Sequence, residues 1–188
     1  MRRILVVVCA LCVLLSSCDF FDDDDVNKNS HVRDEDYEHI ARRVERGFIQ
    51  KMKTERKLHC IGTGGGMMSN IQMMATSFQF FHEVNLEEAR ELVITTTLEY
   101  LKAINGSKEV RPYLEIYPFC PKNVEVMIWI KEPDGYDVPF DQIAQVTLSE
   151  GVISYYSYKY DPGNSYQTLH RETYEEALKI VNEQAKAS

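Results

Sequence analysis

The segment 124–131, VEVMIWIK, alternates branched aliphatic residues with other residues, as a half-buried β-strand does. Two further strands are predicted at 143–149 and 152–160, on either side of the short turn at Glu150-Gly151. Strands that are joined by such short turns pair antiparallel. This part of the chain therefore predicts an antiparallel sheet.

Three helices are predicted around these strands. Over 34–57, apolar residues recur every three or four positions, with acidic residues at the start and basic residues at the end. Asn85 is a favourable cap for a second helix that extends to residue 104. Thr173 and Glu176 have the spacing of a capping box, which predicts a last helix to about residue 185.

Two more strands are predicted, one within 71–84 and a short one at 113–117. The chain has 188 residues, of which 44% are hydrophobic, and this is enough for one ordinary core. We therefore predict a single α+β domain over 34–188. It should contain an antiparallel sheet of four to five strands, with about three helices covering one face.

The N-terminal residues have the pattern of a secretory signal. Met1-Arg2-Arg3 is positively charged, 4–15 is apolar, and two serines precede Cys18. The apolar block is about a dozen residues long, whereas a helix needs roughly 20 to cross a bilayer. A cleaved signal peptide over 1–17 is therefore predicted, rather than a transmembrane helix.

Leu15-Ser16-Ser17-Cys18 resembles the bacterial lipobox. This resemblance implies that the chain is cut before Cys18 and that acyl chains such as palmitate are attached to this cysteine. Two or more acyl chains give stable membrane anchoring. Asp19 resembles the signal that retains lipoproteins in the inner membrane, which implies the periplasmic face of that membrane rather than the outer membrane.

Residues 18–33 are predicted to be a lipidated, flexible and acidic tether, because the run Asp22-Asp23-Asp24-Asp25 repels itself and cannot bury apolar surface. The rest of the chain loosely resembles uncharacterised lipoproteins of obligate intracellular bacteria. That resemblance implies no particular activity.

The charge of the chain excludes one class of partner. The formal net charge is −8, and removal of 1–17 takes away Arg2 and Arg3 but no acid, which leaves −10. Such a surface repels phosphate backbones, so we expect no nucleic-acid partner. The membrane contact is expected to come from the lipid on Cys18.

Two cysteines, Cys60 and Cys120, remain after the signal peptide and the lipidated residue are set aside. In an oxidising compartment they could form a disulfide. Such a bond would close a loop of about 60 residues and contribute roughly 4 kcal/mol in the chain-entropy model. Free buried cysteines are also common, so both alternatives stay open.

A glycine-rich segment follows Cys60. Gly62, Gly64, Gly65 and Gly66 could bind an anion through converging backbone amides, or could form a joint or a strand entry. The segment lacks the lysine of a P-loop. If Cys60 were a nucleophile, these amides could serve as its oxyanion hole, and the base would be His82 or His170 rather than the adjacent His59.

Two further groups of residues could carry a function. Met67, Met68, Met73 and Met74 are soft ligands of the type that binds Cu(I), but a strand would point Met73 and Met74 to opposite faces. We therefore expect no metal and no cofactor. Five tyrosines near the end of the sheet could form a recognition surface or pack under the last helix; they are Tyr155, Tyr156, Tyr158, Tyr160 and Tyr166.

The sequence contains no complete catalytic motif. We therefore expect a membrane-anchored lipoprotein of the cell envelope that acts as a non-catalytic binding or interaction module, with an envelope protein or a small molecule as its ligand. The alternative is a thiol-dependent hydrolase or transferase that uses Cys60 and the segment Gly62–Gly66.

Overall fold

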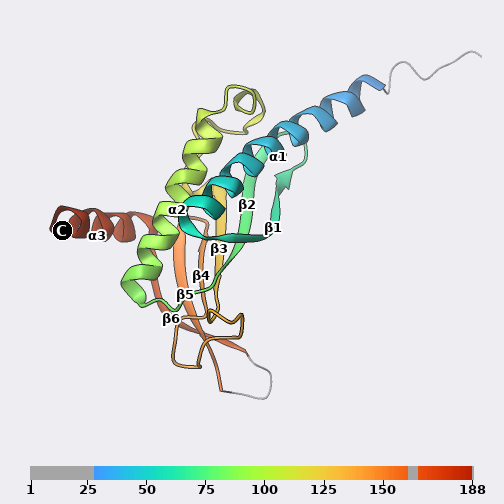
Figure 1. Ribbon diagram of the computed structural model, residues 1–188. Coiled ribbons are helices and arrows are strands. Elements are labelled where there is room, and N and C mark those ends of the chain that lie inside the picture. The colour runs from blue at the N-terminus through green and yellow to red at the C-terminus, as the bar shows by residue number, and fades with distance from the viewer. Residues whose placement is uncertain (1–27, 161–164, 188) are drawn as a thin grey trace, which may run out of the picture.

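The computed structural model of the protein describes residues 28–160 and 165–187 (Figure 1). The predicted signal peptide, Cys18 and most of the predicted tether lie outside these residues. In chain order the elements are α1 (Lys28–Arg56), β1 (His59–Met67), β2 (Ile71–Phe80), α2 (Leu86–Gly106), the 3₁₀ helices η1 (Arg111–Tyr113) and η2 (Pro121–Asn123), β3 (Val124–Ile130), β4 (Gln145–Ser149), β5 (Val152–Tyr158), β6 (Tyr166–Thr173) and α3 (Tyr174–Ala187).

The six strands form one sheet in which they lie side by side in chain order. The predicted single α+β domain is confirmed in its class, but the sheet is mixed rather than antiparallel. β2 and β3 run parallel, and all other neighbouring strands run antiparallel. The difference arises at α2, because a helical crossover returns the chain to the end of the sheet from which β2 started.

The number of strands also differs from the prediction of four to five. The sequence did not indicate β1, which is rich in glycine, or β6, which is mostly polar. The predicted strand at 113–117 is absent: this segment contains the end of η1 and a loop, and Leu114 makes only an isolated bridge to Ile71. Prolines at 112 and 118 flank the segment and cannot donate a backbone hydrogen bond to a sheet.

Two helices cover one face of the sheet. In Figure 1, α1 and α2 cross in front of the strands, and α3 extends beyond the edge formed by β6. Phe48 on α1 stacks on Tyr100 of α2, with ring centroids 4.4 Å apart, and meets Phe78 of β2 edge-on at 5.9 Å. All three side chains are buried. This aromatic group therefore joins both helices to the sheet.

Helix α1 begins six residues before the predicted start at Asp34, so the acidic residues 34–36 lie inside the helix rather than in its first turn. Its predicted apolar stripe is confirmed, with Tyr37, Ala41, Phe48 and Met52 buried. Among the described residues, we find no helix whose length and apolar character would suit it to span a membrane.

The predicted helix caps are confirmed at both sites. The Asn85 side chain accepts a hydrogen bond from the Glu88 backbone N–H at 3.0 Å, and the Asn85 N–H donates to the Glu88 carboxylate at 2.9 Å. Thr173 and Glu176 form the same reciprocal pair at the start of α3. Both caps satisfy backbone amides that the first turn of a helix leaves unpaired.

A buried carboxyl lies between α1 and the sheet. Glu45 is 5% exposed, and its side chain accepts a hydrogen bond from the Tyr100 hydroxyl at 2.8 Å. A second hydrogen bond comes from the Thr63 side chain. Burial nevertheless dominates and raises the pKa of the Glu45 carboxyl above its usual value.

The raised pKa of Glu45 predicts a pH-dependent effect of Glu45→Gln. Below the ordinary pKa of a glutamate, the carboxyl is neutral in the folded and the unfolded chain, so the variant should match the parent. As pH rises through the unfolded and then the folded pKa, the parent must bury a charge and loses stability. Glu45→Gln should therefore raise the free energy of unfolding at pH 7 but not near pH 4, as measured by urea denaturation. An equal effect at both pH values would contradict this account.

Candidate ligand-binding pocket

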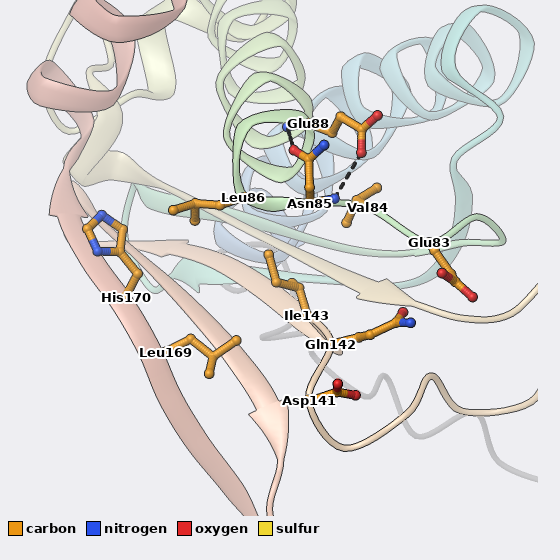
Figure 2. Close-up of a pocket in the computed structure, with 10 residues that line it drawn as sticks. All are labelled: Glu83, Val84, Asn85, Leu86, Glu88, Asp141, Gln142, Ile143, Leu169 and His170. Carbon is orange, nitrogen blue, oxygen red and sulfur yellow. Dashed lines mark hydrogen bonds between the residues drawn. The ribbon is translucent and has the colours of Figure 1, made fainter.

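A pocket of about 630 Å³ opens between the start of α2, the segment before β4 and strand β6 (Figure 2). We call it the His170 pocket. It lies on the face of the sheet that the helices cover. Its lining residues come from three separate parts of the chain and are Glu83, Val84, Asn85, Leu86, Glu88, Asp141, Gln142, Ile143, Leu169 and His170.

A β-bulge in β6 shapes one wall of the pocket. Tyr155 pairs with His170, whereas Tyr156 pairs with Thr168, so Leu169 has no residue opposite it. Such a bulge interrupts the usual alternation and can turn two successive side chains to one side of the sheet. Figure 2 shows the side chains of Leu169 and His170 lying side by side at the pocket.

His170 lies next to a buried network of charged and polar side chains. Glu172 accepts hydrogen bonds from the Arg90 Nε at 2.8 Å and from the Tyr155 hydroxyl at 2.6 Å. The side chains of Arg90 and Glu172 are only 8% and 6% exposed. The other carboxylate oxygen of Glu172 lies 3.7 Å from His170 Nε2. The network thus ties α2, β5 and β6 together beneath the pocket.

Tyr155 remains a hydrogen-bond donor in this network. Its burial, together with the bond to Glu172, raises the pKa of its hydroxyl far above the usual value. Its ring centroid lies 5.6 Å from that of His170. The imidazole is therefore held between an aromatic ring and a carboxylate, while 40% of its side chain stays exposed.

The lining is acidic and apolar at the same time. It includes three carboxylates, on Glu83, Glu88 and Asp141, and no lysine or arginine. Desolvation and the nearby Glu83 charge raise the pKa of Glu132, so a further carboxyl lies close to Glu83. Apolar wall comes from Val84, Leu86, Ile143 and Leu169. Such a lining favours a ligand that has an apolar body and a positive group.

The structure does not bring Cys60 and His170 together. Cys60 lies on β1 and His170 on β6, which are the opposite edges of the sheet. Five strand spacings of about 4.8 Å separate these edges by roughly 24 Å. The rings of His59 and His82 pack against Phe81 and Phe80. The Cys60 thiol contacts only the Gly62 carbonyl oxygen, at 3.5 Å, among the hydrogen-bond partners described.

The glycine segment is part of a strand and not a loop. Gly64, Gly65 and Gly66 pair with successive residues of β2, from Ala75 to Met73. Their amides therefore alternate in direction along the strand, as in any β-ladder. A β-ladder does not bring these amides together at one point, and anion binding by this segment stays a prediction.

Cys60 and Cys120 are both free thiols. Cys60 lies level with Phe78 of β2, whereas Val124, which follows Cys120 after the short helix η2, lies level with Met74. Four strand residues correspond to about 13 Å, and a disulfide needs Cα atoms within about 7 Å.

We predict that alkylation of the denatured domain labels both Cys60 and Cys120 without reductant. The reason is that both are free thiols, with Cys60 on the edge strand β1 and Cys120 before β3. Mass spectrometry of the labelled peptides checks this, with a reduced sample as the control. Labelling that requires reductant would contradict the observed register.

Three of the four methionines lie in different environments. Met74 is buried in the core, Met73 lies on the other face of the sheet, and Met68 is 84% exposed. Within residues 28–160 and 165–187 we find no group of three or more His, Cys, Asp or Glu side chains positioned to hold a metal ion.

The five tyrosines divide between several environments. Tyr155 is buried on the helix-covered face, and the Tyr158 hydroxyl donates to Asp137 at 2.6 Å. Tyr166 meets the rings of Trp129 and Tyr156 on the opposite face. Neither the predicted recognition surface nor the predicted packing under the last helix describes all five.

The buried ion pair beneath the pocket had no signal in the sequence. Arg90 and Glu172 are charged residues of the kind that usually lie at the surface, and 82 positions separate them in the chain. Only the pairing of β6 with β5 brings Glu172 under α2. No protein-family model, curated protein or solved structure matches the chain.

Proposed function

We propose that the chain is a lipid-anchored, non-catalytic binding module of the bacterial cell envelope, and that its His170 pocket binds an amphipathic ligand with a positively charged group. The lipobox-like residues 15–18 support the anchor on Cys18, and Asp19 supports the periplasmic face of the inner membrane. The partner is an envelope protein or a small molecule that presents this chemistry.

The composition of the pocket is the observation that carries the proposal. Its volume of about 630 Å³ is in the range of small-molecule sites, roughly 300–1,000 Å³. Three carboxylates attract a cation, and no lysine or arginine of the lining opposes it. The four aliphatic side chains gain free energy when an apolar body covers them.

The buried network prepares the pocket for binding. Arg90, Tyr155 and Glu172 fix the strand residues next to Leu169 and His170, so little side-chain order has to be created when a ligand enters. Such preorganisation lowers the entropic cost of binding.

The lining does not fit the thiol-dependent alternative. It contains no cysteine. Cys60 lies at the opposite edge of the sheet, where it cannot reach a ligand in this pocket.

A comparison of hexylamine with hexanoate tests the ligand class, with calorimetry on the full chain at pH 7. The two probes have the same apolar body and opposite charges. Hexylamine should bind, and hexanoate should bind at least about tenfold more weakly, because a tenfold difference needs only 1.4 kcal/mol. Equal binding of the two probes, or tighter binding of hexanoate, would exclude the proposed cationic ligand.

Matched variants locate the binding. Glu83→Gln combined with Asp141→Asn should weaken hexylamine binding about tenfold, since each carboxylate lies at the pocket. Glu115→Gln combined with Glu183→Gln removes the same charge from exposed positions elsewhere and should leave binding unchanged. Identical effects of the two pairs would show that only the net charge matters.

The anchor has its own test. A Cys18→Ser variant should leave the detergent phase in a phase-partition experiment and lose incorporation of labelled palmitate. Persistence of either property would contradict the proposed lipidation.

A further inference from the structure

The two edges of the sheet differ in chemistry. β6, at one edge, carries Arg171, Glu172 and the bulge at Leu169, which are features that discourage pairing with another strand. β1, at the other edge, belongs to a stretch without any Asp, Glu, Lys or Arg between Lys57 and Glu83. After an irregularity at Ile61, the residues of β1 from 62 to 66 pair with β2 without interruption.

The glycines of β1 are not all required by the fold of the chain. A Cβ atom at Gly62 would meet nothing within 4 Å, and one at Gly64 would meet only the Ala75 Cβ at 3.9 Å. Neither residue has a positive φ. By contrast, a Cβ at Gly65 would lie 2.5 Å from the Met73 carbonyl oxygen. Gly62 and Gly64 are therefore not needed for packing within the chain, but they leave the backbone of β1 open to a strand from another molecule.

Both ends of β1 carry exposed apolar side chains that would meet in a pair of antiparallel β1 strands. Ile61 near one end is 51% exposed, and Met68 just after the other end is 84% exposed. An antiparallel arrangement of two β1 strands, centred on Gly64, brings Ile61 of one copy next to Met67 and Met68 of the second copy. The two-fold axis repeats this apolar contact, so it is made once on each side of Gly64.

Charge also favours a second copy at this edge. Two chains of net charge −8 repel each other, and an uncharged strand keeps this repulsion low at the contact. Beside Gly64, a groove between α1 and β1 is lined by Glu38 and Arg42, which form an ion pair.

We propose that two copies of this chain pair through β1, in antiparallel orientation about Gly64, to form a continuous sheet of two six-stranded halves. About this centre, residues 61–67 of the two strands lie opposite each other, and seven residues of about 3.4 Å each give a contact roughly 24 Å long. Stable dimers bury about 1,200–2,000 Å², so the flanking α1 helices must add to the strand contact. The dimer contact lies at the sheet edge opposite the His170 pocket.

Co-purification of two differently tagged copies of the full chain, in a mild detergent, tests the pairing. Each tag should recover the other copy. Ile61→Lys combined with Met68→Lys should reduce this recovery at least about tenfold, because four lysines then meet across the axis. Leu98→Lys combined with Ile116→Lys changes two other exposed apolar residues and should have no effect. Failure of the parent chains to co-purify would overturn the proposal.

Cysteine cross-linking tests the register. Gly62→Cys, Gly64→Cys and Gly66→Cys are each placed in a chain that carries Cys60→Ser and Cys120→Ser, which alone is the control. Opposed residues of an antiparallel pair have Cα atoms about 4.5–5.5 Å apart, within the range of a disulfide. Oxidation should link the Gly64→Cys chain into a reducible dimer, and the other two far less. Absence of a dimer at all three positions would contradict the pairing.

Discussion

Glu172→Ala should lower the free energy of unfolding by about 3–5 kcal/mol, as expected when one partner of a buried ion pair is removed. The Arg90 guanidinium, whose side chain is 8% exposed, would keep its charge without a counter-charge. The Tyr155 hydroxyl would lose the oxygen to which it donates at 2.6 Å. Urea denaturation monitored by circular dichroism measures the effect.

Two control variants separate the parts of this network. Tyr155→Phe removes one hydroxyl and should cost only about 1–2 kcal/mol. Arg90→Met combined with Glu172→Leu removes both charges and should be more stable than Glu172→Ala, since no buried charge is left unpaired. A loss below about 1 kcal/mol for Glu172→Ala would show that water reaches Arg90, and that the network does not support His170 as described.

Phe48→Ala should destabilise the domain by about 3–5 kcal/mol, which is typical of a phenylalanine removed from a core. Phe48 is 3% exposed and contacts Tyr100 and Phe78, so the variant would leave a cavity where both helices meet the sheet. The loss of two aromatic contacts adds to the lost burial.

The matched control for Phe48→Ala is Gln50→Ala, two positions later on the exposed side of α1. A surface substitution of this kind should change stability by no more than about 0.5 kcal/mol. Similar denaturation midpoints for the two variants would mean that α1 contributes little to the core.

The sequence predicted the elements whose side chains alternate or recur regularly. The alternation of 124–131 predicts β3 because one face of that strand is buried. The caps at Asn85 and Thr173 were predictable because they depend on residues three positions apart. These features are local, because the residues that determine each of them lie within one short segment of the sequence.

The features that the sequence did not predict depend on distant segments. Nothing within β1 or β6 alternates in polarity, because each strand is an edge with little burial. The parallel pairing of β2 with β3 depends on where α2 packs. The His170 pocket requires the bulge at Leu169 and the pair of Arg90 with Glu172, and neither can be inferred before the strand register is known.

Nuclear magnetic resonance during a titration of the full chain with hexylamine tests the central claim most directly. Signals of the His170 imidazole and of the Leu169 and Ile143 methyl groups should shift together and saturate, because all three residues line one pocket. Hexanoate at the same concentrations should leave them unchanged. Hexylamine that binds without moving these signals, or that does not bind at all, would contradict the assignment of this pocket as the binding site.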